Sequence, residues 1–395
     1  MGDSQAKACP DGGMPWRKTE PVMERAHFIA LLEEGFYSMS ELCKHFGISR
    51  KTGYKWRERF QAEGLAGLAD QRRAPHTCPH RTAATTEAAL VQAREAHPHW
   101  GPKKLLPHLA RTQPALSLPA QSTAGEVLKR QGLVPNQKVR RKPTHPGTPT
   151  LVADAPNDVW MADFKGEFPT RNGHLCYPLT VTDAHSRFIL ACQALPSTQF
   201  PDTLTVFTQL FAAYGLPQAI RTDNGNPFVT TAIGGLSRLN VRWIKLGIQH
   251  QRITPGRPQE NGRHERMHRT LKAETTRPPD WDLPGQQQRF DRFRHEFNQE
   301  RPHEALAQRW PGALYLPSGR PLPACLPEPE YAGHLRVRRV SSPGTISFRS
   351  RPLFISEVLV GEYLGLEEVD DDLWSVFFYD VLLGRFHVRD WRLRG

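Results

Sequence analysis

Proline is the residue that most constrains how this chain can fold. There are 35 prolines among its 395 residues, nearly twice the usual share of about 5%. Because proline ends helices and interrupts strand pairing, the chain must consist of short elements with stiff connections, and a coiled-coil rod is excluded. No stretch approaches the roughly 18 consecutive apolar residues of a membrane span, and the first twenty residues lack the apolar core of a signal peptide.

Charge is distributed unevenly along the chain. The net charge is +12, most of it lies in residues 1–150, and residues 151–395 are nearly neutral. A basic front half attached to a near-neutral body suggests a module that binds a polyanion, although a solubilising surface has the same composition. The six cysteines show no C-x-x-C spacing, so we expect reduced thiols and a cytoplasmic location.

A helix-turn-helix unit is predicted over residues 22–73. The string SMSELCKHFGISRKTGYKWRERF gives a short helix, a glycine-containing turn and a second helix that Ser49 is expected to cap. The residues expected on its inner side are Thr52, Gly53, Trp56 and Phe60. Those expected on its outer side are Arg50, Lys51, Tyr54 and Lys55. A basic outer face is typical of a helix that reads DNA, whereas a basic amphipathic helix alone is common in proteins.

Further units follow along the chain. Residues 85–134 predict a second helical, helix-turn-helix-like domain, whose last helix either reads DNA, which we favour, or only packs. From residue 157 strand and helix patterns alternate, which indicates an α/β domain with a mixed sheet. Short β runs from about residue 336 predict a small all-β barrel or sandwich, of which we favour the barrel. The expected segments are a flexible N-terminus (1–21), the two helical domains (22–73 and 85–134), a basic proline-rich linker (135–156), a catalytic core with its following helix (157–316), a second linker (317–332) and the barrel domain (333–395).

Three acidic residues in the α/β region suggest metal chemistry. Asp163 lies in the strand WMADF, Asp223 ends a later strand before Asn-Gly, and Glu265 lies on the helix ENGRHERMHRTLK. Carboxylates at strand ends and on a facing helix can hold Mg²⁺, which prefers oxygen ligands, and two such ions ~4 Å apart assist phosphoryl displacement. Arg269 and Lys272 share the face of Glu265 and would bind phosphate. For this helix in isolation, a surface Glu–Arg pair explains the spacing equally well.

Together the local strings resemble a known enzyme family. WMADFKG, RTDNGNPF and GRPQENGRHERMHRTLK are similar to the three catalytic blocks of transposases of the retroviral-integrase type, and FNQERPHEAL is similar to the segment that follows them in bacterial insertion sequences. The resemblance covers residues 22–316 and is closest to the IS three and IS four-eighty-one groups. It maps the Asp-Asp-Glu triad onto Asp163, Asp223 and Glu265. The interval between Asp223 and Glu265 is longer than usual, and Glu260 lies nearer the usual spacing, but HERMHRTLK aligns with the family block.

The resemblance implies a multidomain α+β protein with an RNase H-like core, which acts as a DNA transposase. Its helix-turn-helix units would bind the terminal inverted repeats of the element. The core would catalyse phosphodiester hydrolysis and 3′-OH strand transfer into target DNA with two Mg²⁺ ions, which Mn²⁺ can replace. Asp163, Asp223 and Glu265 would be both catalytic residues and metal ligands, without zinc. A homo-oligomer is expected because two DNA ends must be held together.

Two other classes of protein remain open. A DNA-binding regulator derived from a transposase would keep the fold and lack catalysis, although the presence of all three acids argues against it. A nuclease of RNase H type would act on RNA–DNA hybrids, which the basic helix-turn-helix front end disfavours because A-form grooves admit no recognition helix. The transposase would be cytoplasmic and associated with the bacterial nucleoid.

Overall fold

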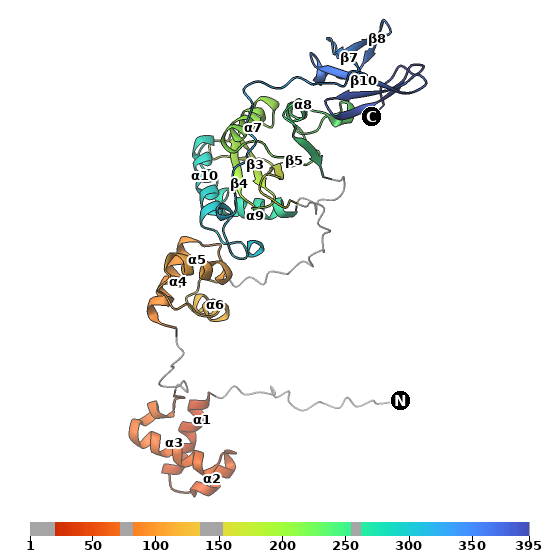
Figure 1. Cartoon of the computed structure of the whole chain (residues 1–395). Helices are drawn as coiled ribbons and strands as arrows, with labels where there is room; N and C mark the ends of the chain where they lie inside the picture. The colour runs from red at the N-terminus through yellow and green to blue at the C-terminus, as the bar shows by residue number, and fades with distance from the viewer. Residues whose placement is uncertain (1–19, 72–81, 135–152, 254–261, 395) are drawn as a thin grey trace, which may run out of the picture. The chain divides into compact units, whose positions relative to one another are not determined.

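The computed structural model describes residues 20–71, 82–134, 153–253 and 262–394 (Figure 1). The contacts divide the chain into two compact units, Met1–Arg81 and Thr82–Gly395. None of the described helices is long and apolar enough to cross a membrane. Glu260, which lies nearer the usual spacing from Asp223, is outside the described residues, as is most of the 135–156 linker.

The first unit is a three-helix domain with the expected helix-turn-helix. Its helices are α1 (Pro21–Glu33), α2 (Met39–His45) and α3 (Arg50–Glu63). Ser49 caps α3, as predicted, by accepting a hydrogen bond from the Thr52 amide at 3.2 Å. Gly53 permits α3 to lie close to α2, because a Cβ there would come within 2.7 Å of Cys43 Sγ. Gly53 and Trp56 are buried, so the predicted inner face of α3 is confirmed.

Three further helices begin the second unit: α4 (Ala84–Ala96), α5 (Pro102–Thr112) and α6 (Gln121–Arg130). They enclose a small apolar cluster of their own that includes Leu90, Trp100 and Leu128. They also contact the α/β core, because His97 Nδ1 lies 3.0 Å from Glu296 Oε1. Arg111 adds a hydrogen bond to the carbonyl of Gln299 at 3.1 Å. The α4–α6 helices therefore pack on the core.

The core is a six-stranded mixed sheet, as the strand and helix pattern predicts. Its strands are β1 (Val159–Phe164), β2 (Phe168–Pro169), β3 (Leu175–Asp183), β4 (Ile189–Leu195), β5 (Ala219–Thr222) and β6 (Gln249–Arg252). They are ordered β2-β3-β1-β5-β6, with β4 also paired to β3. The pairs β1–β3 and β3–β4 are antiparallel, whereas β1–β5 and β5–β6 are parallel.

Helices cover both faces of this sheet (Figure 1). On one face α7 (Phe200–Tyr214) and α8 (Arg238–Lys245) enclose the larger apolar cluster, which includes Trp160, Phe207 and Trp243. On the other face lie α9 (Gly262–Thr275) and α10 (Leu283–Gln299). The buried residues that α10 contributes are Phe290, Phe293 and Phe297, the stripe that the sequence predicts as core. The sheet is thus the middle layer of three, which leaves its strand ends accessible.

The C-terminal region has the expected β strands, but the predicted barrel was wrong. The strands are β7 (Arg336–Arg339), β8 (Thr345–Phe348), β9 (Arg351–Phe354), β10 (Tyr363–Asp370), β11 (Leu373–Phe378) and β12 (Val381–His387). They form an open four-stranded sheet, β12-β11-β10-β7, and a separate β8–β9 hairpin. Their apolar interior also receives Leu236 and Val241 from the core, and Lys245 pairs with Glu362 at 2.8 Å. Because α8 and the loop before it cover part of this interior, the sheet buries its apolar face without closing on itself.

Candidate active site

Asp163 is held near the end of the central strand β1. Its Cα partner on β3 is Thr180, and the Thr180 hydroxyl donates to the Asp163 carbonyl at 3.0 Å. The side chain of Asp163 is 15% exposed. Ala162 belongs to the cluster beneath α7 and α8, and because side chains alternate along a strand, Asp163 faces the α9 side of the sheet.

Asp223 lies at the same edge of the sheet as Asp163. The parallel register pairs Ala162 with Thr222, so each aspartate is the next residue on one of two neighbouring strands, roughly 4.8 Å apart. Asp223 Oδ1 accepts a hydrogen bond from the Gly225 amide at 3.2 Å. Asn224 Nδ2 donates to the carbonyl of Ile253 at 3.0 Å, which ties the loop after β5 to the end of β6. The register therefore places two of the three predicted acids directly after neighbouring strand positions at one edge of the sheet.

Glu265 lies in the first turn of α9 and is exposed. Arg269 and Lys272 are exposed as well, whereas Met267 and Leu271 are buried against the sheet, so the predicted division of this helix is observed. The structure therefore leaves the third acid on the solvent side of its helix.

Two histidines that the sequence reasoning missed lie between α9 and Asp163. His264 Nε2 and His268 Nε2 each lie 2.6 Å from Thr180 Oγ1, and His268 Nδ1 lies 3.9 Å from Asp163 Oδ2. Burial lowers the pKa of His264 to about 3. Burial, together with the charges of His264 and Lys165, lowers the pKa of His268 to about 2. The signal that could have found them is their i, i+4 spacing in H-E-R-M-H, which places both side chains on one helix face.

The donor atoms at this edge fit a divalent cation. The ligand atoms of Asp163, His264 and His268 all lie within 4.8 Å of one another. The carboxylates of Asp163 and Asp223 supply the oxygen donors that hard cations such as Mg²⁺ prefer, and the imidazoles supply nitrogen donors that suit later transition ions. Asp163 is the residue common to both sets.

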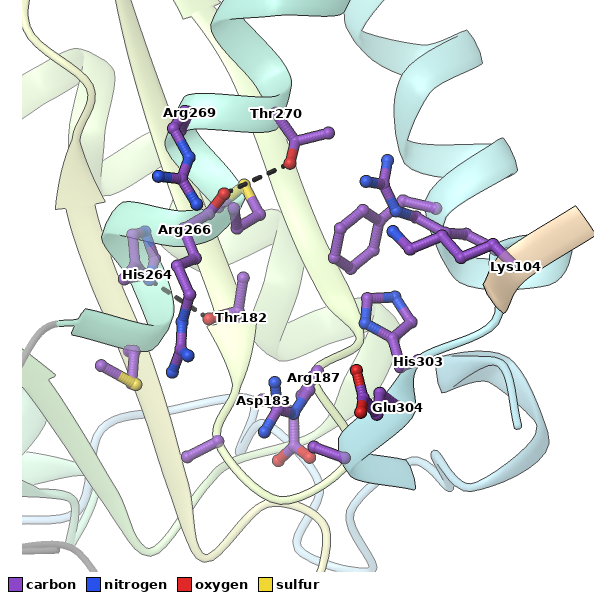
Figure 2. Close-up of a pocket in the computed structure, with 16 residues that line it drawn as sticks. Lys104, Thr182, Asp183, Arg187, His264, Arg266, Arg269, Thr270, His303 and Glu304 are labelled. Carbon is purple, nitrogen blue, oxygen red and sulfur yellow. Dashed lines mark hydrogen bonds between the residues drawn. The ribbon is translucent and has the colours of Figure 1, made fainter. Parts of the chain in front are cut away.

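A pocket of about 570 Å³ with a cationic lining opens beside α9 (Figure 2). Arg266 and Arg269 reach it from α9, Arg187 from the turn between β3 and β4, and Lys104 from α5. Burial, and to a smaller extent the neighbouring charge of Arg301, lower the pKa of Lys104 to about 8. Since Arg269 also lies on the face of Glu265, the pocket and the acid are on adjoining sides of one helix.

Asp183 also lines this pocket, but it has the structural role that its position at a strand end suggests. The residue is 1% exposed. Asp183 Oδ2 accepts hydrogen bonds from the Ser186 amide at 2.7 Å and the Ser186 hydroxyl at 2.6 Å, and Oδ1 accepts one from the Asn157 amide at 2.8 Å. Its carboxylate is therefore committed to the turn after β3.

The predicted DNA-contacting face of α3 is exposed on the first unit. Its residues, all exposed, are Arg50, Lys51, Tyr54 and Lys55. Lys55 Nζ lies 4.7 Å from the ring centre of Trp56 and Arg25 lies 4.0 Å from the same ring. A cation–π contact is worth about 0.5–1 kcal/mol at an exposed site, so the Lys55 contact helps to hold this basic side chain along α3, whereas Arg25 reaches the ring from α1.

The α/β core with its mixed sheet is preceded by helix-turn-helix modules. Family comparison identifies the core: residues 153–258 and 246–311 each match a model described as an integrase core domain. Residues 24–76 match a helix-turn-helix domain, and residues 52–128 match a homeodomain-like domain. The chain thus carries an integrase core domain behind helix-turn-helix domains.

Individual relatives come from viruses and bacteria. The chain is 29% identical over 189 residues to the Gag-Pol polyprotein of baboon endogenous virus (strain M7), which is 48% of this chain and 10% of that protein. It is 26% identical over 249 residues to the insertion element IS476 uncharacterized 39.2 kDa protein of Xanthomonas euvesicatoria, which is 62% of this chain and 68% of that protein. The chain therefore spans about a tenth of the length of its retroviral relatives.

Two solved structures are also similar. The HTLV-2 integrase catalytic core domain in complex with magnesium aligns with a TM-score of 0.34 and 16% identity, over 42% of this chain and 100% of that chain. A simian T-cell lymphotropic virus intasome in complex with PP2A regulatory subunit B56 gamma aligns with a TM-score of 0.36 and 17% identity, over 74% of this chain and 97% of that chain.

Proposed function

We propose that this protein is a DNA transposase, which cleaves phosphodiester bonds at the ends of an insertion element and joins the freed 3′-OH ends to target DNA. The observation that carries the proposal is the placement of Asp163 and Asp223 on adjacent parallel strands of an integrase core domain. The relative from the bacterial insertion element IS476 supports the same assignment.

In this proposal Asp163, Asp223 and Glu265 hold two Mg²⁺ ions, or Mn²⁺ in their place. Cations bound there would supply Lewis-acid stabilisation to the attacking and leaving oxygens of phosphoryl transfer. Gly225 orients the Asp223 carboxylate through its amide, and the hydroxyl of Thr180 fixes the β1 backbone at Asp163. Glu265, which is exposed in the first turn of α9, would complete the site.

The cationic side chains give the DNA backbone a path beside this site. Arg269 and Lys272 neutralise phosphates next to Glu265, and the pocket lined by Lys104, Arg187 and Arg266 extends the same surface. Arg50, Lys51, Tyr54 and Lys55 of α3 read the terminal inverted repeats in the major groove. Handling two DNA ends at once requires a homo-oligomer, and its DNA substrates place the protein at the nucleoid.

A cleavage assay tests this proposal. A labelled duplex that carries the inverted repeats flanking the gene is incubated with the full chain and Mg²⁺, and products are resolved on a denaturing gel. We expect nicked and joined strands that disappear when EDTA removes the metal. Tight, salt-sensitive binding without products would instead favour a regulator. Cleavage of an RNA–DNA hybrid in preference to the duplex would favour a nuclease of RNase H type.

A further inference from the structure

The cationic pocket beside α9 lies where the α4–α6 helices meet the α/β core. Its basic lining includes Lys104 on α5, Arg266 and Arg269 on α9, and Arg301 in the segment after α10 (Figure 2). Its volume of about 570 Å³ is within the range of small-ligand sites. Basic side chains from separate parts of the second unit therefore line one cavity.

The acidic residues in and around this lining already have partners. The carboxylate of Asp183 accepts its hydrogen bonds within the turn after β3. Glu304 lies 3.2 Å from Lys103, which is not part of the lining. Glu274 pairs with Arg301 at 3.1 Å. The lining thus has more basic than acidic side chains, and a bound anion would offset the excess charge.

Two buried nitrogen atoms of the lining have no hydrogen-bond partner among the described residues. They are Nε of Arg301 and Nε2 of His303, and Arg301 as a whole is only 6% exposed. Most buried polar groups in proteins have a partner, so a buried nitrogen without one is a candidate contact for a bound ion. Because Arg301 is a cation, the ion that suits this place is an anion.

Lys104 reaches the pocket through contacts that hold α5 on the core. Arg111, two turns further along α5, donates a hydrogen bond to the carbonyl of Gln299 at 3.1 Å and lies 4.5 Å from the ring centre of Trp310. Lys104 itself is half-buried. An anion that Lys104 and the α9 arginines bind at once would therefore tie the α4–α6 helices to the core.

We propose that this pocket binds one phosphate group of the DNA backbone, with Lys104 and Arg266 as its ligands, and that the bound phosphate fastens the α4–α6 helices to the core. This inference rests on the proposed function, because it takes DNA to be the substrate. Hydrogen bonds from lysine or arginine to phosphate are charge-assisted and roughly twice as strong as neutral ones. The α4–α6 helices and α9 then hold the same DNA strand.

A scan of methylphosphonate linkages along the labelled repeat duplex tests this contact, because each substitution removes the charge of a single phosphate. Fluorescence anisotropy measures the affinity of the full chain for each duplex. At one linkage we expect neutralisation to weaken wild-type binding by about tenfold, as the loss of a charge-assisted hydrogen bond would. The same linkage should weaken the binding of Lys104→Gln by less than about twofold, because its partner is already gone.

Other variants separate the contact from general effects. Arg266→Gln should lose the effect of the same linkage, so the test remains valid if Lys104→Gln does not fold. Arg111→Ala, which loosens α5 from the core, should reduce that effect although Lys104 is kept. Lys103→Gln is the matched control, because it removes an equal charge one residue away, at a side chain that is 55% exposed. It should keep the full effect.

The proposal is overturned if no linkage distinguishes Lys104→Gln from wild type, or if Lys103→Gln loses the same effect. Calorimetric titration with pyrophosphate separates the two sources of a phosphate group. Pyrophosphate binding that requires Lys104, without any linkage effect, would show a site for a free phosphate compound and refute the DNA contact. DNA products without a linkage effect would refute this pocket contact alone, whereas a linkage effect without DNA products would refute the transposase activity alone.

Discussion

Nε2 of His250 lies 2.9 Å from Oγ1 of Thr222, the residue immediately before Asp223. The Thr222 hydroxyl donates to the Asp223 carbonyl at 2.8 Å, and Asn240 Nδ2 donates to His250 Nδ1 at 3.1 Å. The same arrangement occurs at Thr180, which bonds the Asp163 carbonyl and two buried histidines. Each aspartate of the site is thus supported by a threonine that a neutral imidazole holds in place.

This use of buried neutral histidines predicts that the second unit loses stability in mild acid. Burial lowers the pKa of His250 to about 4 and that of His303 to about 3, from an ordinary value of 6.5. The unfolded chain therefore binds protons below about pH 6.5 that the folded chain does not. The free energy of unfolding falls as the pH falls from about 6.5 toward 4, by up to about 1.4 kcal/mol per pH unit for each such histidine.

Urea unfolding at pH 7.5 and pH 5.5 measures this loss. His303 is a buried histidine that lies away from the two aspartates. His303→Gln removes it and should therefore make the pH dependence of the free energy of unfolding shallower. His295→Gln, at an exposed position on α10, is the matched control and should leave the dependence unchanged. Equal slopes for wild type and His303→Gln would show that this histidine does not resist protonation.

Gly225 is predicted to matter because of the carboxylate that it touches. A Cβ at Gly225 would lie 3.0 Å from Asp223 Oδ2, so Gly225→Ala must displace the carboxylate that the Gly225 amide orients. We expect DNA cleavage to fall by about tenfold or more, with little change in the urea midpoint. Gly101→Ala is the matched control, because a Cβ at Gly101 has nothing within 4 Å. Full activity of Gly225→Ala would mean that Asp223 needs no such orientation.

The exposed face of α3 is predicted to set DNA affinity. Lys51→Ala should weaken binding to the terminal-repeat duplex and reduce the slope of log affinity against log salt concentration by about one. Tyr54→Ala should reduce the free energy of DNA binding by about 1–3 kcal/mol if the side chain contacts a base edge. Fluorescence anisotropy across a series of salt concentrations measures both quantities. Arg292→Ala, at an exposed position on α10, should bind like wild type. If all three variants bound alike, α3 would not be the recognition helix.

Much of the fold is predictable where a local pattern is strong. Phe290, Phe293 and Phe297 recur at helical spacing and form one buried stripe, and Ser49 begins α3 as its cap. The polar strand β6 (Gln249–Arg252) has no apolar alternation because it lies at the edge of the sheet, so its sequence gives no strand signal. The open C-terminal sheets were likewise not predictable, since closure depends on pairing between distant strands and on burial beneath Val241.

The candidate site shows the same limit. Asp163 and Asp223 follow strands with clear patterns, and their adjacency results from the β1–β5 pairing. His264 and His268 depend on Thr180, which lies 84 and 88 positions away in the sequence. No local property of α9 indicates that partner. Lys104 reaches the pocket beside α9 only because the α4–α6 helices pack on the core.

The most direct test of the account compares product formation with DNA binding in the same preparations. Asp163→Asn and Asp223→Asn are assayed with the labelled repeat duplex and Mg²⁺, beside Asp291→Asn, which changes a half-exposed aspartate on α10. We predict that both site variants bind DNA like wild type but yield at least about a hundredfold less nicked and joined product, while Asp291→Asn retains full activity. Wild-type levels of product from Asp223→Asn would contradict the assignment of the chemistry to this edge of the sheet.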